Sequence, residues 1–408
     1  MRNQKKLRYV ICLNELLEIL ICIDKEKKIL PQVITDEWSF SLNGNEYVCI
    51  SHKRNLNILR KTTWLSIDSL SFSDVKSIDR EAIDYFLKNL DHFLIEQEVL
   101  DSYHFVKALE NEDITQLSKI PKSDLHNHVP YGGNRLLVSN LVGKDIPKLT
   151  KRLNSIPEMN DWCDKYIKTP NDFCTRVRAA FVQAKQDGIK VFAPNIAPCA
   201  QKHFESFEKF MDYIRQLVLE FSEYMRIYPE LCLDRHKFSD DLEELVIKYL
   251  NTGLFYSIDL TGDEKLGVKE FRKIYCIADE YGIVKKAHVG EFSDSESIYE
   301  AISILGLDCI QHGISATQNK KLLQLIRERN ISLTICPTSN YYLSRISDYK
   351  SHPIKDLFRS KVNVSICSDD ALIFDSAVSS EYLRLYKSNV LNPVELNSVR
   401  IFGLKFYD

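Results

Sequence analysis

His126 and His128 stand two positions apart at the end of a short strand-like run, Pro121–His128. Side chains two positions apart on a β-strand share one face, so both imidazoles can approach the same metal ion. A His-x-His pair alone is weak support, because ten histidines in 408 residues will sometimes fall at this spacing on a solvated strand. Polar residues at the ends of later apolar runs strengthen the metal interpretation.

His288 and Asp369 each close a later apolar run and can add a nitrogen and an oxygen ligand. Three histidines and one carboxylate suit zinc and leave room for a water molecule, whose pKa the cation lowers to about 7. We therefore expect one zinc ion per chain, although iron, cobalt and manganese also accept these ligands. The chemistry indicated is metal-assisted hydrolysis.

Glu291 and His312 are candidates for proton transfer and charge stabilisation. Glu291 follows His288 by three positions and must lie where the strand has turned into a loop. A carboxylic acid shielded there from water can shuttle a proton, worth about 10²–10⁴-fold in rate. His312 can orient hydroxide and stabilise charge on the attacking oxygen. Taken in isolation, a surface glutamate and a core histidine are the plainer interpretations.

Asp369 and Asp370 form an adjacent pair of carboxylates after the last apolar run. Adjacent side chains on a strand point in opposite directions, so Asp369 can bind the metal while Asp370 bonds the substrate. The alternative is that the pair caps a following helix.

Eight apolar segments after Ile120 alternate with amphipathic stretches, as in parallel β/α units. The candidate ligands follow the first, fifth, sixth and eighth segments; they converge at the mouth of a barrel but would be spread across a doubly wound open sheet. We therefore expect an α/β fold, a (β/α)8 TIM barrel with a small N-terminal α+β domain. The predicted strands are Asp124–His128, Val191–Ala197, Leu231–Arg235, Phe255–Leu260, Val284–Val289, Cys309–His312, Leu333–Cys336 and Val362–Cys367.

The chain is expected to have three regions: a small β-containing domain at 1–72, a helical connector at 73–116 and the barrel at 117–408. In the first region, Ser39–Leu42 and Tyr47–Ile50 flank Asn43-Gly44-Asn45, a hairpin signal. In the second, apolar residues between Ile78 and Leu94 recur at helical spacing.

Charge and composition limit the partners and the compartment. The net charge of -3, from 54 basic and 57 acidic residues, gives no broad electrostatic reason to expect nucleic acid or a membrane surface as a partner. Acidic residues interrupt the apolar run near the N-terminus, so no secretory or membrane-spanning segment is expected. We expect a cytoplasmic protein that binds a small molecule and can form a homo-oligomer through its N-terminal domain.

Together these residues resemble the adenosine/AMP deaminase family of metal-dependent hydrolases. The resemblance runs from about Leu117 to the C-terminus. The order and spacing of its motifs make the match specific. The motifs are Ile120–His128, Asp259–Glu264, His288–Glu291, His312–Gly313, Cys336–Asn340 and Ser368–Asp370.

The resemblance implies a role for each motif in removing the 6-amino group of a purine. Metal-activated water would add to C6, and ammonia would leave to give a 6-oxopurine. Glu291 would protonate the ring, His312 would orient the water, Asp370 would bond purine N7 and the Gly262 backbone would contact the ring. The implied zinc ligands, of which Asp369 is also counted as catalytic, are His126, His128, His288 and Asp369.

The loop after His128 departs from the pattern of the nucleoside deaminases. Those enzymes commonly continue with Leu-Asp-Gly, whereas this chain has Val129-Pro130-Tyr131-Gly132-Gly133. An aspartate there would repel a 5′-phosphate, so Pro130 favours a nucleotide substrate. Asn134, Arg135 and the backbone amides of the two glycines can then receive the phosphate. A plain tight turn is the alternative.

The leading hypothesis is a zinc-dependent deaminase of an adenine nucleoside or its 5′-monophosphate, ribo or deoxy. Two alternatives remain at this stage. One is a catalytically inactive nucleotide-binding or signalling barrel, and the other is an amidohydrolase that acts on another 6-substituted purine.

Overall fold

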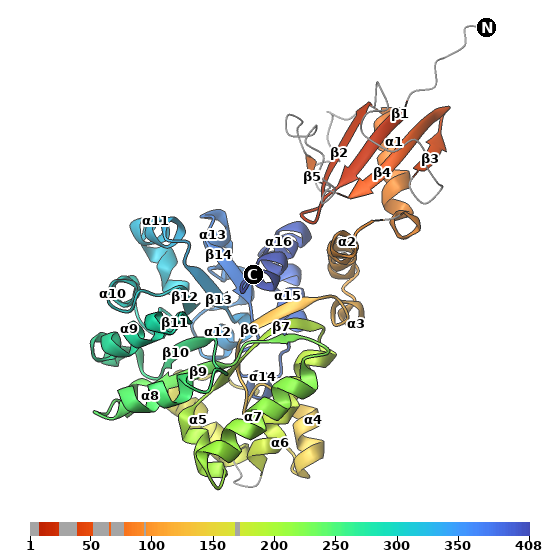
Figure 1. Ribbon diagram of the computed structural model, residues 1–408. Coiled ribbons are helices and arrows are strands. Elements are labelled where there is room, and N and C mark those ends of the chain that lie inside the picture. The colour runs from red at the N-terminus through yellow and green to blue at the C-terminus, as the bar shows by residue number, and fades with distance from the viewer. Residues whose placement is uncertain (1–7, 24–38, 52–64, 67–76, 94, 168–171) are drawn as a thin grey trace, which may run out of the picture. The chain divides into compact units, whose positions relative to one another are not determined.

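The computed structural model describes residues 8–23, 39–51, 65–66, 77–93, 95–167 and 172–408 (Figure 1). The chain divides into two compact units, Met1–Asn111 and Glu112–Asp408. Residues 73–76, where the predicted helical connector begins, lie outside the described residues. The division of the chain into three regions at 72 and 116 stays a prediction.

The first unit contains a five-stranded sheet followed by helices. Asn43 and Gly44, with φ of 49° and 78°, make the turn between antiparallel β3 and β4, so the predicted hairpin is confirmed. Phe40 and Tyr85, with ring centroids 4.6 Å apart, join the sheet to the first helix. The elements are β1 (Arg8–Leu13), β2 (Glu18–Ile23), β3 (Ser39–Leu42), β4 (Asn45–Ser51), β5 (Leu65–Ser66), α1 (Ser77–Lys88), η3 (Leu90–His92) and α2 (Gln97–Glu110), with strand order β3-β4-β1-β2-β5.

Eight parallel strands, paired in chain order, form a nearly closed barrel in the second unit. Each predicted strand is confirmed with its ends within two residues of the observed bounds, and a short extra strand, β8 (Arg226–Ile227), pairs with β7. The barrel strands are β6 (Lys122–His128), β7 (Ile189–Ile196), β9 (Glu230–Asp234), β10 (Ser257–Thr261), β11 (Val284–Val289), β12 (Cys309–His312), β13 (Ser332–Ile335) and β14 (Asn363–Ile366).

Helices surround the strands on the outside of the barrel (Figure 1). The α-helices are α3 (Ile114–Leu117), α4 (Arg135–Val142), α5 (Ile156–Tyr166), α6 (Phe173–Gln186), α7 (Phe207–Phe221), α8 (Leu242–Leu250), α9 (Arg272–Glu280), α10 (Ser295–Leu305), α11 (Lys320–Glu328), α12 (Pro337–Tyr342), α13 (Ile354–Arg359), α14 (Ala371–Phe374), α15 (Val378–Lys387) and α16 (Pro393–Leu404). Short 3-10 turns are η5 (Pro198–His203), η6 (Arg235–Lys237), η7 (Glu264–Leu266), η8 (Lys269–Phe271), η9 (Ile314–Gln318) and η10 (Tyr349–Ser351).

The barrel closes between its last strand and its first, immediately beside the candidate ligands. The Asp369 N–H donates to the carbonyl of His126 at 2.9 Å, and the His128 N–H donates to the carbonyl of Asp369 at 3.3 Å. Below this seam, the buried Asp124 carboxylate accepts from the Ser368 N–H at 3.1 Å and from its hydroxyl at 2.5 Å. Closure therefore excludes the open-sheet alternative and brings the ends of β6 and β14 together.

The barrel interior contains a layer of charged and polar side chains. Lys286 and Glu230, both fully buried, form an ion pair at 2.6 Å. Glu230 also accepts from Ser257, Gln311 and Asn195 at 2.8, 3.2 and 3.0 Å. Buried charges require such pairing, because burying an unpaired charge would cost on the order of several kcal/mol. This polar layer supports the histidines described below.

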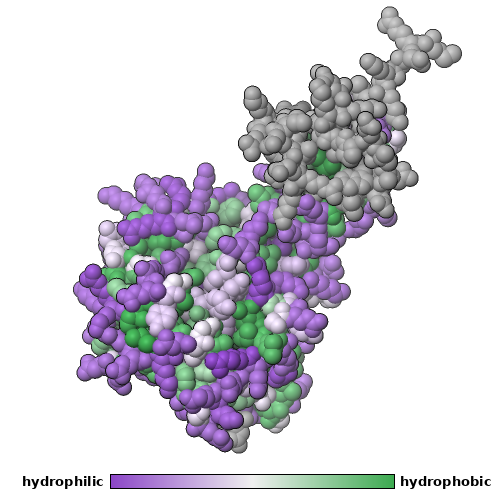
Figure 2. All heavy atoms as spheres, in the orientation of Figure 1, coloured by the Kyte–Doolittle hydropathy of each residue, from purple (hydrophilic) through white to green (hydrophobic). Residues whose placement is uncertain are grey.

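The visible surface of the barrel unit carries mostly hydrophilic residues, with smaller apolar patches between them (Figure 2). Among the helices that the structure describes, none combines the length and apolar character that crossing a membrane requires.

The seam predicts a pH-dependent contribution to stability. Burial raises the pKa of Asp124 from 3.8 to about 6. Between these values the folded chain binds one more proton than the unfolded chain, so the free energy of unfolding should fall as pH rises from about 4 to about 6. Asp124→Asn, which cannot ionise, should lack this decrease, of order 3 kcal/mol. Denaturant unfolding of both proteins across this pH range measures the difference, and parallel curves would contradict it.

Candidate active site

Three histidines converge at the C-terminal mouth of the barrel. The Nε2 atoms of His126 and His128 on β6 are 3.2 Å apart. The ring of His288 on β11 lies 4.7 Å and 5.3 Å, centroid to centroid, from those two rings. One nitrogen from each histidine lies within 4.8 Å of the others, which is a geometry for holding one metal ion.

Asp369 adds a carboxylate to the same point. Its Oδ1 lies 3.5 Å and 3.4 Å from the Nε2 atoms of His126 and His128. The residue has a φ of 58°, so it has already left the extended conformation of β14, and this left-handed turn separates its direction from that of Asp370. The structure thus brings the four predicted ligands close to one another, as binding of a divalent metal requires.

Partners on the far side of two rings orient His288 and His128. Asp259 on β10 lies with Oδ2 3.0 Å from the Nδ1 of His288. The Oδ1 of Asn195 on β7 lies 3.3 Å from the Nδ1 of His128, and its amide nitrogen donates to Asp259 at 3.0 Å. These contacts place the Nδ1 proton outward and turn Nε2 toward the metal position. Sequence reasoning assigned no such role to either residue.

His126 is fully buried, and burial, followed by the charges of the other histidines, holds its pKa well below the usual value. It is therefore neutral, as a metal ligand must be. Its Nδ1 lies 3.4 Å from the hydroxyl of Thr334 and 3.6 Å from the sulfur of Cys336. Burial raises the pKa of the Cys336 thiol well above its ordinary value, so it lies behind the imidazole as a neutral thiol.

Glu291 lies two residues beyond β11, in the turn that the sequence spacing predicted. Its side chain is buried, and its Oε1 accepts from the amide of Asn340 at 2.7 Å. Burial, followed by the charges of Asp369 and Glu264, raises its pKa well above the ordinary value. The shift favours the protonated carboxyl, the form that can act as an acid.

Glu264 holds the turn that carries Glu291. Its buried carboxylate accepts from the backbone N–H groups of Gly290, Glu291, Phe292 and Ser293 at 2.7, 3.2, 3.1 and 3.0 Å. Burial acts to raise its pKa, but these bonds and that of the Ser293 hydroxyl outweigh burial and lower it. Glu264 belongs to the Asp259–Glu264 motif, in which the sequence assigned it no role of its own. Its hydrogen bonds to the turn after β11 give it a positioning role.

His312 ends β12 with a φ of 59°, an unusual backbone conformation for a residue other than glycine. Its Nε2 lies 3.8 Å from the Oδ2 of Asp369, and its Nδ1 lies 3.3 Å from the amide nitrogen of Asn340. Burial lowers its pKa to about 4, so the ring is neutral. It lies beside the ligand group, where the sequence predicted it.

Asp370 is the N-cap residue of α14, four residues beyond β14, and its side chain makes no capping hydrogen bond; Gly262 directly follows β10. Asp370 is buried, and its Oδ1 has no hydrogen-bond partner among the described residues. Burial, then the charge of Asp369, raises its pKa to about 7. Gly262 follows β10 with a φ of 95°, and an added Cβ would lie 2.8 Å from the Asp234 carboxylate. The left-handed backbone and this close approach of Asp234 both favour glycine at position 262.

The two residues predicted to receive phosphate lie at the start of α4. The Asn134 side chain caps the helix by accepting from the Leu137 N–H at 3.0 Å. Arg135 forms an ion pair with Asp375 at 3.2 Å and donates to the Ile146 carbonyl at 3.0 Å. These contacts hold both residues in place, and their role toward phosphate stays a prediction.

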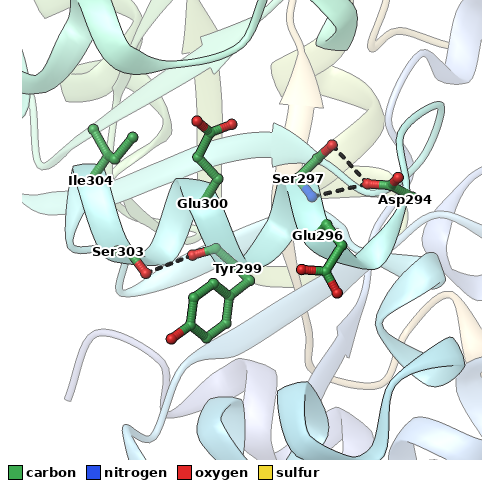
Figure 3. Close-up of a pocket in the computed structure, with 7 residues that line it drawn as sticks. All are labelled: Asp294, Glu296, Ser297, Tyr299, Glu300, Ser303 and Ile304. Atoms are coloured by element: carbon green, nitrogen blue, oxygen red, sulfur yellow. Dashed lines mark hydrogen bonds between the residues drawn. The ribbon is translucent and has the colours of Figure 1, made fainter.

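A surface hollow of about 550 Å³ lies along α10, apart from the ligand group (Figure 3). The N–H and hydroxyl of Ser297 both donate to the Asp294 carboxylate, which caps the helix. Helix capping explains Asp294, and the other acidic side chains of the hollow lie on the outer surface of α10. The lining residues are Asp294, Glu296, Ser297, Tyr299, Glu300, Ser303 and Ile304.

Comparison with known proteins identifies the family. Residues 145–406 match the family described as adenosine deaminase. An adenine deaminase from Zymomonas mobilis is 28% identical over 300 residues, which cover 67% of this chain and 87% of the relative. The chain belongs to the adenosine deaminase family, and it is a metal-dependent hydrolytic deaminase.

Two solved structures share its barrel fold. An adenine deaminase from Arthrobacter aurescens superimposes with a TM-score of 0.61 at 21% identity and covers 69% of this chain and 93% of its own. An N6-mAMP deaminase from Arabidopsis gives a TM-score of 0.60 at 20% identity and covers 70% and 92%. The predicted TIM barrel is thereby confirmed.

The contact between Asp259 and His288 predicts an effect on metal affinity. Asp259→Asn should weaken metal binding by about 10–100-fold, because the carboxylate no longer orients the ring or raises its basicity. Competition with a chromophoric chelator measures this affinity in the full chain. Asp279→Asn, which removes a well-exposed carboxylate from α9, is the matched control and should bind metal as the unmodified protein does. Equal affinities for all three proteins would contradict the orienting role.

Proposed function

We propose that this protein is a zinc-dependent deaminase that converts an adenine nucleoside or its 5′-monophosphate to the 6-oxopurine form with release of ammonia. The observation that carries the proposal is the buried Glu291 carboxyl, whose pKa burial raises, beside the candidate metal ligands His126, His128, His288 and Asp369. An acid of raised pKa next to a metal-activated oxygen is the pairing that hydrolytic removal of an amino group from an aromatic ring requires.

The donor set supports zinc as the bound metal. His126, His128, His288 and Asp369 offer three imidazole nitrogens and one carboxylate oxygen. When bound, zinc supplies a Lewis acid that lowers the pKa of water to about 7. Other divalent metals accept the same donors, so zinc is proposed from its preference for this set.

Glu291 and His312 are proposed to act on either side of the reacting carbon. Glu291 delivers its proton to a ring nitrogen as oxygen adds to C6, so that the negative charge does not accumulate on the ring. Neutral His312 lies between this acid and Asp369 and holds the attacking oxygen in place. The proton of the added hydroxyl group then passes to the 6-amino nitrogen, the C6–N bond breaks, and ammonia leaves to give the 6-oxopurine.

Asp370 and Gly262 are proposed to hold the purine. With its pKa raised to about 7, Asp370 can keep a proton and donate it in a hydrogen bond to purine N7. Its unpartnered, buried Oδ1 supports a ligand contact at this position. The Gly262 backbone is the proposed contact with the face of the ring.

The loop after β6 is proposed to recognise the part of the substrate beyond the purine ring. Pro130 stands where nucleoside deaminases carry an aspartate, so a 5′-phosphate meets no negative charge there. Backbone amides at Gly132 and Gly133, with Asn134 and Arg135, are the proposed phosphate contacts. The related proteins are named for adenine and N6-mAMP, so both compounds belong in a test.

Substitution of Glu291 tests the acid role. Glu291→Gln removes the proton but preserves the size of the side chain, so turnover should fall by about 10²–10⁴-fold. Metal content, measured by elemental analysis, should stay unchanged because Glu291 is not a ligand. Glu296→Gln changes an exposed glutamate on α10 and serves as the control with normal turnover. Turnover in Glu291→Gln within a few fold of the unmodified protein would contradict the assignment.

A substrate panel tests the class of compound. Metal-quantified protein should release ammonia from at least one of adenosine, deoxyadenosine, AMP and dAMP, with the product mass of the 6-oxopurine. Release from the monophosphates alone would support the role of Pro130, and release from the nucleosides alone would reject it. Ammonia from adenine alone, or methylamine from N6-methyl-AMP alone, would indicate another 6-substituted purine. No release from any compound by metal-loaded protein would favour an inactive barrel.

A further inference from the structure

Asn340 connects the two groups proposed for proton transfer. It lies on α12, which follows β13, and it is fully buried. Its amide nitrogen is 2.7 Å from the Oε1 of Glu291 and 3.3 Å from the Nδ1 of His312. Its Oδ1 is 3.2 Å from the Nε2 of a further buried histidine, His352. The proposed function assigns no role to Asn340 or His352.

The protonation of His352 follows from its other neighbour. The backbone N–H of Ile354 lies 3.0 Å from the Nδ1 of His352. A backbone N–H can only donate, so Nδ1 must accept and carries no proton. Burial lowers the pKa of His352 to about 3, so the ring is neutral and its one proton is on Nε2. That proton points to the Oδ1 of Asn340.

This contact fixes which way the Asn340 amide points. Because His352 Nε2–H donates, its partner on Asn340 must be the oxygen, and the amide nitrogen faces the other way. The two hydrogens of that nitrogen then have two acceptors, Glu291 Oε1 and His312 Nδ1. Every polar atom of the amide has a partner, as a buried polar group requires.

We propose that His352 and Asn340 are positioning residues that set the tautomer of His312 and the oxygen of Glu291 that carries the acid proton. Since His312 Nδ1 accepts from Asn340, the His312 proton is on Nε2, the nitrogen that faces Asp369. Since Glu291 Oε1 accepts from Asn340, the acid proton is on Oε2. The consequence for catalysis rests on the proposed function: with its proton on Nε2, His312 donates a hydrogen bond to the attacking oxygen, and Glu291 delivers the proton.

The tautomer can be measured directly, without turnover. In the full chain labelled with ¹⁵N-histidine and loaded with zinc, NMR at neutral pH should show neutral His312 and His352 with the proton on Nε2. Spectra of His352→Phe and His312→Gln assign the two sets of signals. A proton on Nδ1 of His312 in the unmodified protein would overturn the proposal. If the unmodified protein released no ammonia, the proposed function would fail, whereas this tautomer result would still stand.

Asn340→Asp tests the donor itself, because it keeps the shape of the side chain but removes both N–H groups. We expect kcat to fall by about 100-fold with KM changed little, as for loss of one donor in a charge-stabilising group. The His312 signal should lose the pure Nε2–H pattern, while zinc content stays equal. Asn363→Asp is the matched control. Asn363 lies at the start of β14, and its amide donates a hydrogen bond to the Oδ1 of Asn330, so this substitution removes a comparable donor and should leave kcat and the spectrum unchanged.

Two substitutions of His352 separate positioning from packing. His352→Phe keeps a ring but has no donor, and kcat should fall about as far as in Asn340→Asp. His352→Gln restores an N–H group and should recover at least part of kcat. Equal kcat in His352→Phe and the unmodified protein would overturn the proposal. If either variant failed to fold, the tautomer of His312 in the unmodified protein would decide the question.

Discussion

The structure depends on the way in which Asp369 joins the last strand of the barrel to the first. Its backbone bonds to both His126 and His128, while its carboxylate meets their Nε2 atoms. The left-handed backbone at Asp369 permits both contacts, because an extended residue would continue the strand and turn its side chain away. One residue thus completes the seam of the barrel and adds its carboxylate to the group of candidate ligands.

The charged interior of the barrel serves to hold the histidines of the candidate site in place. Asn195 and Asp259, which contact the candidate ligands His128 and His288, reach the layer in which Glu230 is paired with Lys286. Replacing such buried charges by apolar residues often stabilises a protein, so stability alone does not explain them. They instead hold imidazoles in one tautomer and one orientation, which a hydrocarbon core cannot do. Fixed dipoles near the reacting atoms also need no rearrangement during reaction.

Much of the fold and the ligand group could be predicted from local patterns. Apolar runs of four to eight residues, each ended by polar residues, identified all eight strands, and the order of His126, His128, His288 and Asp369 at strand ends identified the mouth of the barrel. Glu264, Asn340 and His352 could not be assigned roles in this way. The partners of Glu264 are 26 to 29 positions away in the chain, that of Asn340 is 49 away and that of His352 is 12 away. Periodic patterns of apolar residues do not predict contacts between such distant positions.

The amino-acid sequence by itself determined the strand and helix pattern, the residue types of the candidate metal ligands and the family motifs, because these depend on residues close together in the chain. The tertiary structure decided the properties that depend on burial and on distant neighbours. Burial raises the pKa of Glu291 and lowers that of His312, although each is an ordinary residue type in the sequence. Which nitrogen or oxygen carries a proton depends on donors from other strands, since desolvation and hydrogen bonding act through space.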